Sequence, residues 1–203
     1  MTAFGKTTIA LISNAAPFAI RAERASDVVA REALLDACFG ENRHMRACQR
    51  LRDGRAPAEG LALSVVRQEG QEQLVGTVRL WHVSAGGRSA LMLGPLAVDD
   101  TCRGLGVGAA LMDHALELAK ARGHSAVILL GDAPYYIRFG FSAEKTGELS
   151  LPGPFERDRL LGLELSDGAL DGIRGMIAPT GALLLKPASI SGKKARHVVP
   201  QAA

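Results

Sequence analysis

A glycine-rich loop that joins an apolar segment to an amphipathic helix constrains the fold more than any other feature of this sequence. Ala90–Val98 (ALMLGPLAV) is apolar almost throughout, as expected of a strand buried on both faces. After the loop Thr101–Gly106, apolar residues at helical spacing predict a helix over Val107–Arg122, which ends before Gly123. Ala126–Leu130 (AVILL) predicts a second buried strand. Such a unit forms a right-handed crossover between two parallel strands.

The segments before this unit favour antiparallel pairing. We therefore predict an α/β fold with one mixed, twisted sheet flanked by helices, because a doubly wound sheet would repeat the crossover unit. Pro95 cannot donate to a strand ladder, so it predicts a bulge or splay in the central strand. The further predicted elements are a strand Phe18–Arg21, a helix Val28–Cys38, a weak helix Arg43–Asp53, a hairpin of Leu61–Gln68 and Leu74–Val83, and a late strand Leu160–Leu165 followed by a turn at Asp167-Gly168.

Length and composition fit one globular domain. The chain has 203 residues, 47% of them hydrophobic, and we expect a loose leader over residues 1–17, a domain over 18–187 and a flexible tail over 188–203. Its three cysteines lack metal-ligand spacing, so we expect them to be free thiols in a reducing compartment. No stretch approaches the ~18 apolar residues of a membrane span. The net charge of +3 lies partly in the tail. We predict a cytoplasmic protein with no metal and with neither a nucleic-acid nor a membrane partner.

The loop itself indicates an anion site. Backbone N–H groups at a helix N-terminus, left accessible by glycine, bind phosphate groups. One interpretation is an oxidoreductase that binds a nicotinamide or flavin dinucleotide, because Gly104-x-Gly106-x-x-Ala109 satisfies the G-x-G-x-x-G/A fingerprint and Asp132 follows the next strand where a ribose partner would stand. The fingerprint lies behind antiparallel hairpins, however, and no second mononucleotide-binding half follows. A turn that only packs strand against helix is a further alternative.

A wider pattern carries a family resemblance. The loop reads Arg103-x-x-Gly106-x-Gly108, and Tyr136-Ile-Arg-Phe-Gly140-Phe follows the next strand. In this order and separation, the two motifs resemble the pyrophosphate loop and the Y-x-x-x-G-F element of the GNAT superfamily of N-acetyltransferases. The resemblance implies acetyl-CoA as cosubstrate, an amine acceptor that is a small molecule or a peptide, and a sheet splayed at its central strand; it leaves a homodimer open. The implied CoA-binding residues are Leu96, Ala97, Val98, Arg103, Gly104, Leu105, Gly106, Val107, Gly108, Ala109 and Tyr136.

Direct acetyl transfer through a ternary complex needs a base, an oxyanion donor and an acid for the departing thiolate. The resemblance assigns the acid to Tyr136, with Tyr135 as a competitor, and the backbone N–H of Val98 suits the oxyanion. Many relatives place a glutamate on the central strand, but Ala90–Val98 contains no carboxylate, so the base is open. His82, at the end of the neighbouring strand, is our candidate because its ordinary pKa of ~6.5 lies near working pH.

Other residues are less informative about chemistry. We interpret Asp99 and Asp100 as loop residues and Cys102 as a packing residue. A CoA-binding module without catalytic activity remains an alternative, suggested by the missing strand carboxylate. The acceptor is expected to contact residues 37–60 and 150–182, and the first region contains five arginines that indicate either an anionic acceptor or a solvated helix face, namely Arg43, Arg46, Arg50, Arg52 and Arg55.

Overall fold

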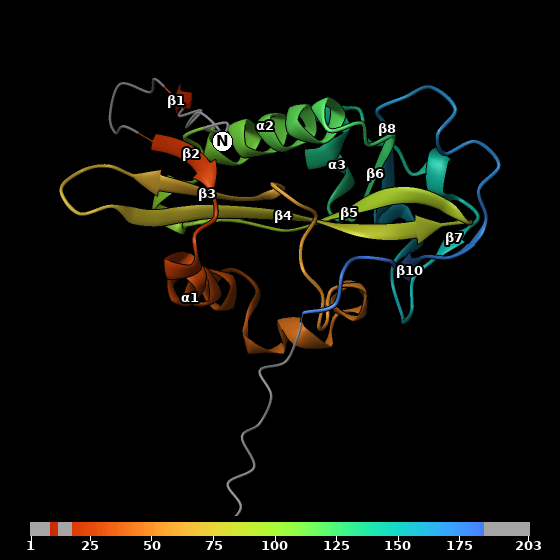
Figure 1. Cartoon of the computed structure of the whole chain (residues 1–203), viewed down its shortest axis with the longest axis horizontal. Coiled ribbons are helices and arrows are strands. Elements are labelled where there is room, and N and C mark those ends of the chain that lie inside the picture. Colours follow the sequence, from red (N-terminus) through yellow and green to blue (C-terminus); the bar gives the residue numbers. More distant parts are fainter. Residues whose placement is uncertain (1–8, 12–17, 185–203) are drawn as a thin grey trace, which may run out of the picture.

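An eight-stranded mixed sheet organises the chain. The computed structural model describes residues 9–11 and 18–184, and the strands run in the order β1-β2-β3-β4-β5-β6-β8, with β10 paired to β4 (Figure 1). The strands of this sheet are β1 (Ile9–Leu11), β2 (Phe18–Ala22), β3 (Ala62–Arg67), β4 (Gln73–Ala85), β5 (Arg88–Val98), β6 (Ala126–Leu130), β8 (Leu160–Glu164) and β10 (Ala178–Pro179). The helices are α1 (Val28–Phe39), α2 (Val107–Ala121) and α3 (Ala133–Tyr136), and β7 (Leu149–Ser150) pairs with β9 (Gly175–Met176).

The sheet has one parallel pair, β5 with β6, and antiparallel neighbours elsewhere along the described strands. This arrangement confirms the predicted mixed sheet and the single crossover, and it is not the doubly wound sheet that the dinucleotide interpretation requires. The parallel pairing covers only Leu91 and Met92, opposite Val127 and Ile128. The two strands therefore separate beyond Met92, as predicted from Pro95.

A bulge accompanies this separation. Val78 of β4 pairs with Leu96, whereas Leu80 pairs with Leu93, so Arg79 alone lies opposite Gly94 and Pro95. An extra residue in one strand bends that strand and ends regular pairing. The second half of β5 consequently turns away from β6 and leaves an open strand edge in the middle of the sheet.

Two hydrophobic layers cover the two faces of the sheet. In Figure 1, α2 and α3 lie on one side of the sheet, and α1 with the segment after it lies on the other. Leu91 and Leu93 of β5 pack with the buried face of α2, while Met92, between them, packs with Ala47 and Leu51 on the opposite face. Alternate residues of a strand point to opposite faces, so β5 is buried on both, as its apolar sequence predicts.

One predicted helix differs from the structure, and the two predicted terminal segments lie mostly outside the described residues. The weak helix predicted over residues 43–53 is two short 3-10 helices, Glu41–Met45 and Ala47–Leu51, because Arg46 between them has an extended backbone (ψ 146°) that interrupts helical hydrogen bonding. The predicted leader lies outside the described residues except for β1, and the predicted tail lies wholly outside them. Within 9–11 and 18–184, no helix is both long enough and apolar enough to cross a membrane.

Candidate active site

The open half of β5 presents backbone hydrogen-bonding groups to a cleft. Asp99 donates its N–H to the carbonyl of Val75 (2.8 Å), and hydrogen-bonded and non-hydrogen-bonded pairs alternate along antiparallel strands. Leu96 and Val98 therefore direct their backbone groups away from β4, and the carbonyl of Val98 accepts a hydrogen bond from the Cys38 thiol instead (3.5 Å). A ligand that carries amides can pair with this edge in the manner of an added strand.

The glycine-rich loop turns the chain from β5 into α2. The Asp99 carboxylate accepts hydrogen bonds from the backbone N–H (2.9 Å) and hydroxyl of Thr101, which fixes the start of the loop. Gly104 and Gly106 have φ values of 76° and 78°, a left-handed conformation that favours glycine. Gly106 is the N-cap of α2, and it offers no side chain to satisfy the first N–H groups of the helix. These donors and the helix dipole form the predicted anion site.

A cavity of about 440 Å³ lies between the open strand edge and this loop. It brings together every residue that was predicted to bind the cofactor except Leu105, which does not line the cavity and is 41% exposed, and Tyr136, which lines a second cavity. Its wall also includes four residues that were not predicted to bind the cofactor, because they come from α1 and from the segment after β6: Cys38, Phe39, Tyr135 and Arg138.

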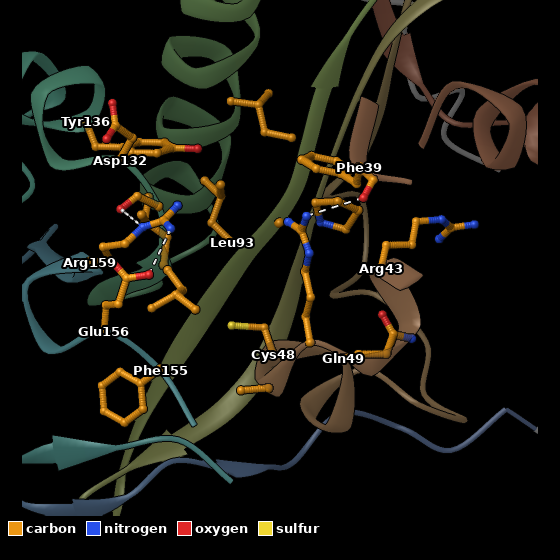
Figure 2. Close-up of a pocket in the computed structure, with 18 of the residues that line it drawn as sticks. Phe39, Arg43, Cys48, Gln49, Leu93, Asp132, Tyr136, Phe155, Glu156 and Arg159 are labelled. Atoms are coloured by element: carbon orange, nitrogen blue, oxygen red, sulfur yellow. Dashed lines mark hydrogen bonds and ion pairs between the residues drawn. The ribbon is translucent and has the colours of Figure 1, made fainter. Parts of the chain in front are cut away.

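A second cavity of about 790 Å³ continues from the first one. The two share Phe39, Leu96, Arg103 and Tyr135 in their walls, so the open edge of β5 runs from the anion site into the larger space. Figure 2 shows two facing walls of this cavity, with Leu93 of β5 between them. One wall carries Tyr136, Asp132, Glu156 and Arg159, and the other carries Phe39, Arg43 and Gln49.

Tyr136 extends into this larger cavity from α3 (Figure 2). Its ring packs edge-on against Tyr135, with centroids 4.9 Å apart, and against Phe141 at 6.0 Å. Burial, together with the smaller effects of nearby Tyr135 and Asp132, raises the pKa of Tyr136 to about 12. The phenol therefore stays protonated at neutral pH and can act as a proton donor.

Tyr135, the competitor for this role, lies between the two cavities. Its hydroxyl comes so close to α2 that a Cβ atom on Gly108 would lie 3.0 Å from it. The guanidinium of Arg138 stacks on the Tyr135 ring, 4.4 Å from the centroid. Burial raises the pKa of Tyr135 as well. Tyr135 thus faces the anion loop, whereas Tyr136 lines the larger cavity and not the smaller one.

His82, the candidate base, lies outside both cavities. Its ring packs near that of His124 (centroids 5.4 Å apart), and its backbone carbonyl accepts hydrogen bonds from Thr180 and Gly181. The structure therefore does not bring His82 together with Tyr136. Cys102 is buried in the core and lines the smaller cavity, Asp99 caps the loop, and Asp100 forms an ion pair with Arg103 (2.8 Å).

Two carboxylates line the larger cavity, and neither was predicted from the sequence to be catalytic. Asp132 lies two residues after the end of β6, and Glu156 lies in the segment before β8, where it pairs with Arg159 at 3.5 Å. Asp132 was considered only as a ribose partner in the dinucleotide interpretation. Its place at the carboxyl end of a buried strand was the available signal, because ligand-binding residues concentrate there in open α/β sheets.

The five arginines of residues 43–55 divide into two groups. Arg43, Arg46 and Arg52 line the larger cavity. Arg50 and Arg55 do not, and they donate to the backbone carbonyls of Pro152 (2.9 Å) and Gly181 (2.5 Å). The arginine-rich segment is therefore neither a uniform solvated face nor a uniform binding surface.

Comparison with known proteins places these features in a family. The sequence model of the acetyltransferase (GNAT) family matches residues 29–141, which include β5, the glycine loop, α2 and both tyrosines. A curated relative, the uncharacterized N-acetyltransferase YhbS of Escherichia coli strain K12, is 30% identical over 161 residues, which are 78% of this chain and 93% of the relative.

Two solved structures share the fold along most of the chain. YhbS from Escherichia coli in complex with CoA superposes with a TM-score of 0.68 at 28% identity, and the match covers 84% of this chain and 93% of that one. A GNAT family acetyltransferase from Brucella melitensis in complex with acetyl-CoA superposes with a TM-score of 0.51 at 27% identity, covering 76% and 98%.

Proposed function

The chain belongs to the GNAT acetyltransferase family, and from this premise we propose that acetyl-CoA occupies the smaller cavity and that the acetyl group passes to an amine in the larger one. The observation that carries the proposal is the open edge of β5, which runs from the α2 loop into the cavity lined by Tyr136. Pyrophosphate would bind the N–H groups of the loop, and the pantetheine amides would pair with Leu96 and Val98. The complexes of the two solved relatives with CoA and acetyl-CoA support this placement.

The proposed reaction is direct transfer. The neutral amine attacks the thioester carbon, a C–N bond forms, and the negative charge that develops on the carbonyl oxygen is stabilised by the backbone N–H of Val98. The C–S bond then breaks, and the sulfur leaves with the electron pair and takes a proton from the Tyr136 phenol. The proton released by the amine goes to a base and returns to the phenol through solvent, so the products are the amide and CoA with a free thiol.

Tyr136 suits the acid role despite its high pKa. A phenol with a pKa of about 12 is a weak acid for a thiolate whose thiol has an ordinary pKa of about 8.5. The main cause of the raised value is burial, however, and burial also disfavours a thiolate that forms beside the phenol. The gap between donor and acceptor is therefore smaller in the cavity than in water.

We propose Asp132 as the base in place of His82. Its carboxylate lies on the same wall as Tyr136 (Figure 2), and within residues 18–184 it has no ion-pair partner, whereas Glu156 is engaged by Arg159. We also place the enzyme in the cytoplasm, since its three cysteines are free thiols, as suits a reducing compartment.

The experiment that tests the proposed chemistry compares Tyr136→Phe with Tyr135→Phe. Release of CoA is followed with a thiol reagent and a panel of amines, and acetyl-CoA affinity is measured separately. We expect Tyr136→Phe to lower kcat by about 100-fold or more, as for loss of a general acid, with acetyl-CoA affinity retained. Equal kcat values for wild type and Tyr136→Phe, with Tyr135→Phe impaired, would transfer the role to Tyr135. A chain that binds acetyl-CoA but acetylates no amine would support the non-catalytic alternative.

A further inference from the structure

The larger cavity contains arginine side chains that form no ion pair with any Asp or Glu side chain. All 21 Asp and Glu residues lie between residues 18 and 184, so the structure describes each of them. Arg43 forms ion pairs with Glu32 (2.5 Å) and Asp36 (2.6 Å). Arg46 and Arg52, on the same wall, form no ion pair with any of these carboxylates.

The contacts of Arg46 and Arg52 leave most of their donors unused. Arg46 stacks on the Phe39 ring, 5.1 Å from its centroid, and donates one weak hydrogen bond to the Phe39 carbonyl (3.4 Å). Arg52 donates from Nε to the Cys48 carbonyl (3.2 Å). A guanidinium carries five N–H donors, so both terminal nitrogens of Arg52 remain available. The neighbouring carboxylate of Asp53 accepts from Gln49 instead (2.6 Å).

Arg52 is half-buried at this wall of the cavity, whereas Arg46 is exposed. Burial lowers the pKa of Arg52; nearby Cys48 and Asp53 offset part of this effect, and the positive charges of Arg43 and Arg46 add to it. A partly buried guanidinium with unused donors gains from a ligand that supplies the counter-charge. Arginine matches the geometry of carboxylate and phosphate oxygens, to which it donates paired hydrogen bonds.

CoA is not the ligand that this pair fits. The anion site for its phosphates lies at the α2 loop, and neither Arg46 nor Arg52 lines the smaller cavity, whose arginines are Arg103 and Arg138. Asp132, in contrast, lies on the wall that faces the arginine-bearing segment (Figure 2). The larger cavity is thus acidic at the Tyr136 side and basic at the other, and its volume of about 790 Å³ suits a small molecule.

We propose that the acceptor is a small amine that also carries an oxyanion, a carboxylate or a phosphate, which binds Arg46 and Arg52 while the amine faces Tyr136 and Asp132. This inference rests on the proposed function, because it names the class of acceptor for the same reaction. The anionic group fixes the acceptor at one end of the cavity and holds its amine near the thioester. Binding energy used for such positioning contributes directly to the rate.

The first test measures anion binding and needs no knowledge of the acceptor. The protein is saturated with CoA so that the loop is occupied, and succinate and inorganic phosphate are then titrated by calorimetry. We expect at least one of them to bind the wild type and to bind Arg46→Gln/Arg52→Gln more weakly by on the order of tenfold or more. Arg50→Gln is the matched control, because Arg50 lies in the same segment but outside both cavities.

The second test compares acceptors in pairs that differ only in the anion. Tyrosine is paired with tyramine, and phosphoethanolamine with ethanolamine, which separates carboxylate from phosphate recognition. Among the pairs that react, we expect the more anionic member to have the higher kcat/KM in the wild type and to lose this advantage in the double variant.

The results separate the inference from the function on which it rests. Anions that fail to bind the CoA-saturated wild type, or that bind the wild type and the double variant equally, overturn the inference and leave acetyl transfer untouched. The same holds if the amines without an anion react as well as their partners. A protein that binds no CoA at all would contradict the proposed function itself.

Discussion

Gly131 keeps open the space that the Tyr136 ring occupies, and its replacement by alanine tests whether the position of the phenol matters. A Cβ atom at residue 131 would overlap Cε2 of Tyr136 and lie 2.9 Å from its Cδ2. Carbon atoms in contact lie about 3.5–4.0 Å apart, so the ring must move by roughly 1 Å. A displacement of about 1 Å at a reacting group costs on the order of 100-fold in rate. We expect Gly131→Ala to lower kcat by about that factor.

The assay is a double-mutant comparison of steady-state CoA release. Loss of a general acid costs about 100-fold to 10,000-fold, so Tyr136→Phe sets the upper limit for any effect that acts through the hydroxyl. In the Tyr136→Phe background, Gly131→Ala should have a much smaller effect than it has alone, because the group it displaces is already absent. Acetyl-CoA affinity should remain close to that of the wild type in all variants.

A matched glycine controls for the substitution itself. Gly147 has helical backbone angles (φ −52°, ψ −35°), and a Cβ atom there would meet only the Glu144 carbonyl at 3.8 Å, an ordinary contact. We expect Gly147→Ala to retain wild-type kcat. Wild-type kcat in a folded Gly131→Ala protein would refute the reasoning, as would an equal loss in the presence and absence of the Tyr136 hydroxyl.

Three further predictions concern proton transfer and stability. Because the pKa of Tyr136 is raised to about 12, its phenol stays protonated, and the ratio of wild-type to Tyr136→Phe kcat should stay constant from pH 7 to about 10; a ratio that falls in this range contradicts the assignment. Arg21 lowers the pKa of Asp27, a carboxylate only 6% exposed, to about 2, so its stabilisation is present above pH about 4 and is lost as pH falls towards 2. Urea unfolding of Asp27→Asn should show a loss of about 2 kcal/mol at pH 7 and a smaller loss at pH 3, with the exposed Asp158→Asn unchanged. Leu111→Ala, which removes a fully buried side chain of α2, should cost about 3 kcal/mol of unfolding free energy, and a loss below about 1 kcal/mol would contradict its core position.

Local signals were sufficient to predict the scaffold of the site. The helix α2 was predicted within one residue, since its apolar spacing and Gly123 are contained in the segment itself. Pro95 predicted the separation of β5 from β6, because a missing N–H donor limits pairing wherever the strand lies in the sheet. The prediction of one helix over residues 43–53 was wrong, because nothing in the local sequence indicates the extended backbone of Arg46.

The contents of the larger cavity depended on tertiary structure. His82 lies at the end of one predicted strand and Asp132 follows another, and only the packing of β4, β5 and β6 decides which of them lies beside Tyr136. The pairing of Arg43 with Glu32 and Asp36, and the lack of ion-pair partners for Arg46 and Arg52 among residues 18–184, likewise depend on the fold and not on spacing along the chain.

Calorimetric titration with acetyl-CoA tests most directly whether the cleft between β5 and α2 is the cofactor site. Gly108 is a suitable position to block it, because its backbone conformation is ordinary, whereas Gly106 has a φ of 78°. A side chain there would enter the smaller cavity beside the Tyr135 hydroxyl and Val98. We predict that the wild type binds one acetyl-CoA and no NADH, and that folded Gly108→Leu binds neither. Acetyl-CoA binding that is unchanged in Gly108→Leu, or NADH binding without acetyl-CoA binding, would contradict this assignment.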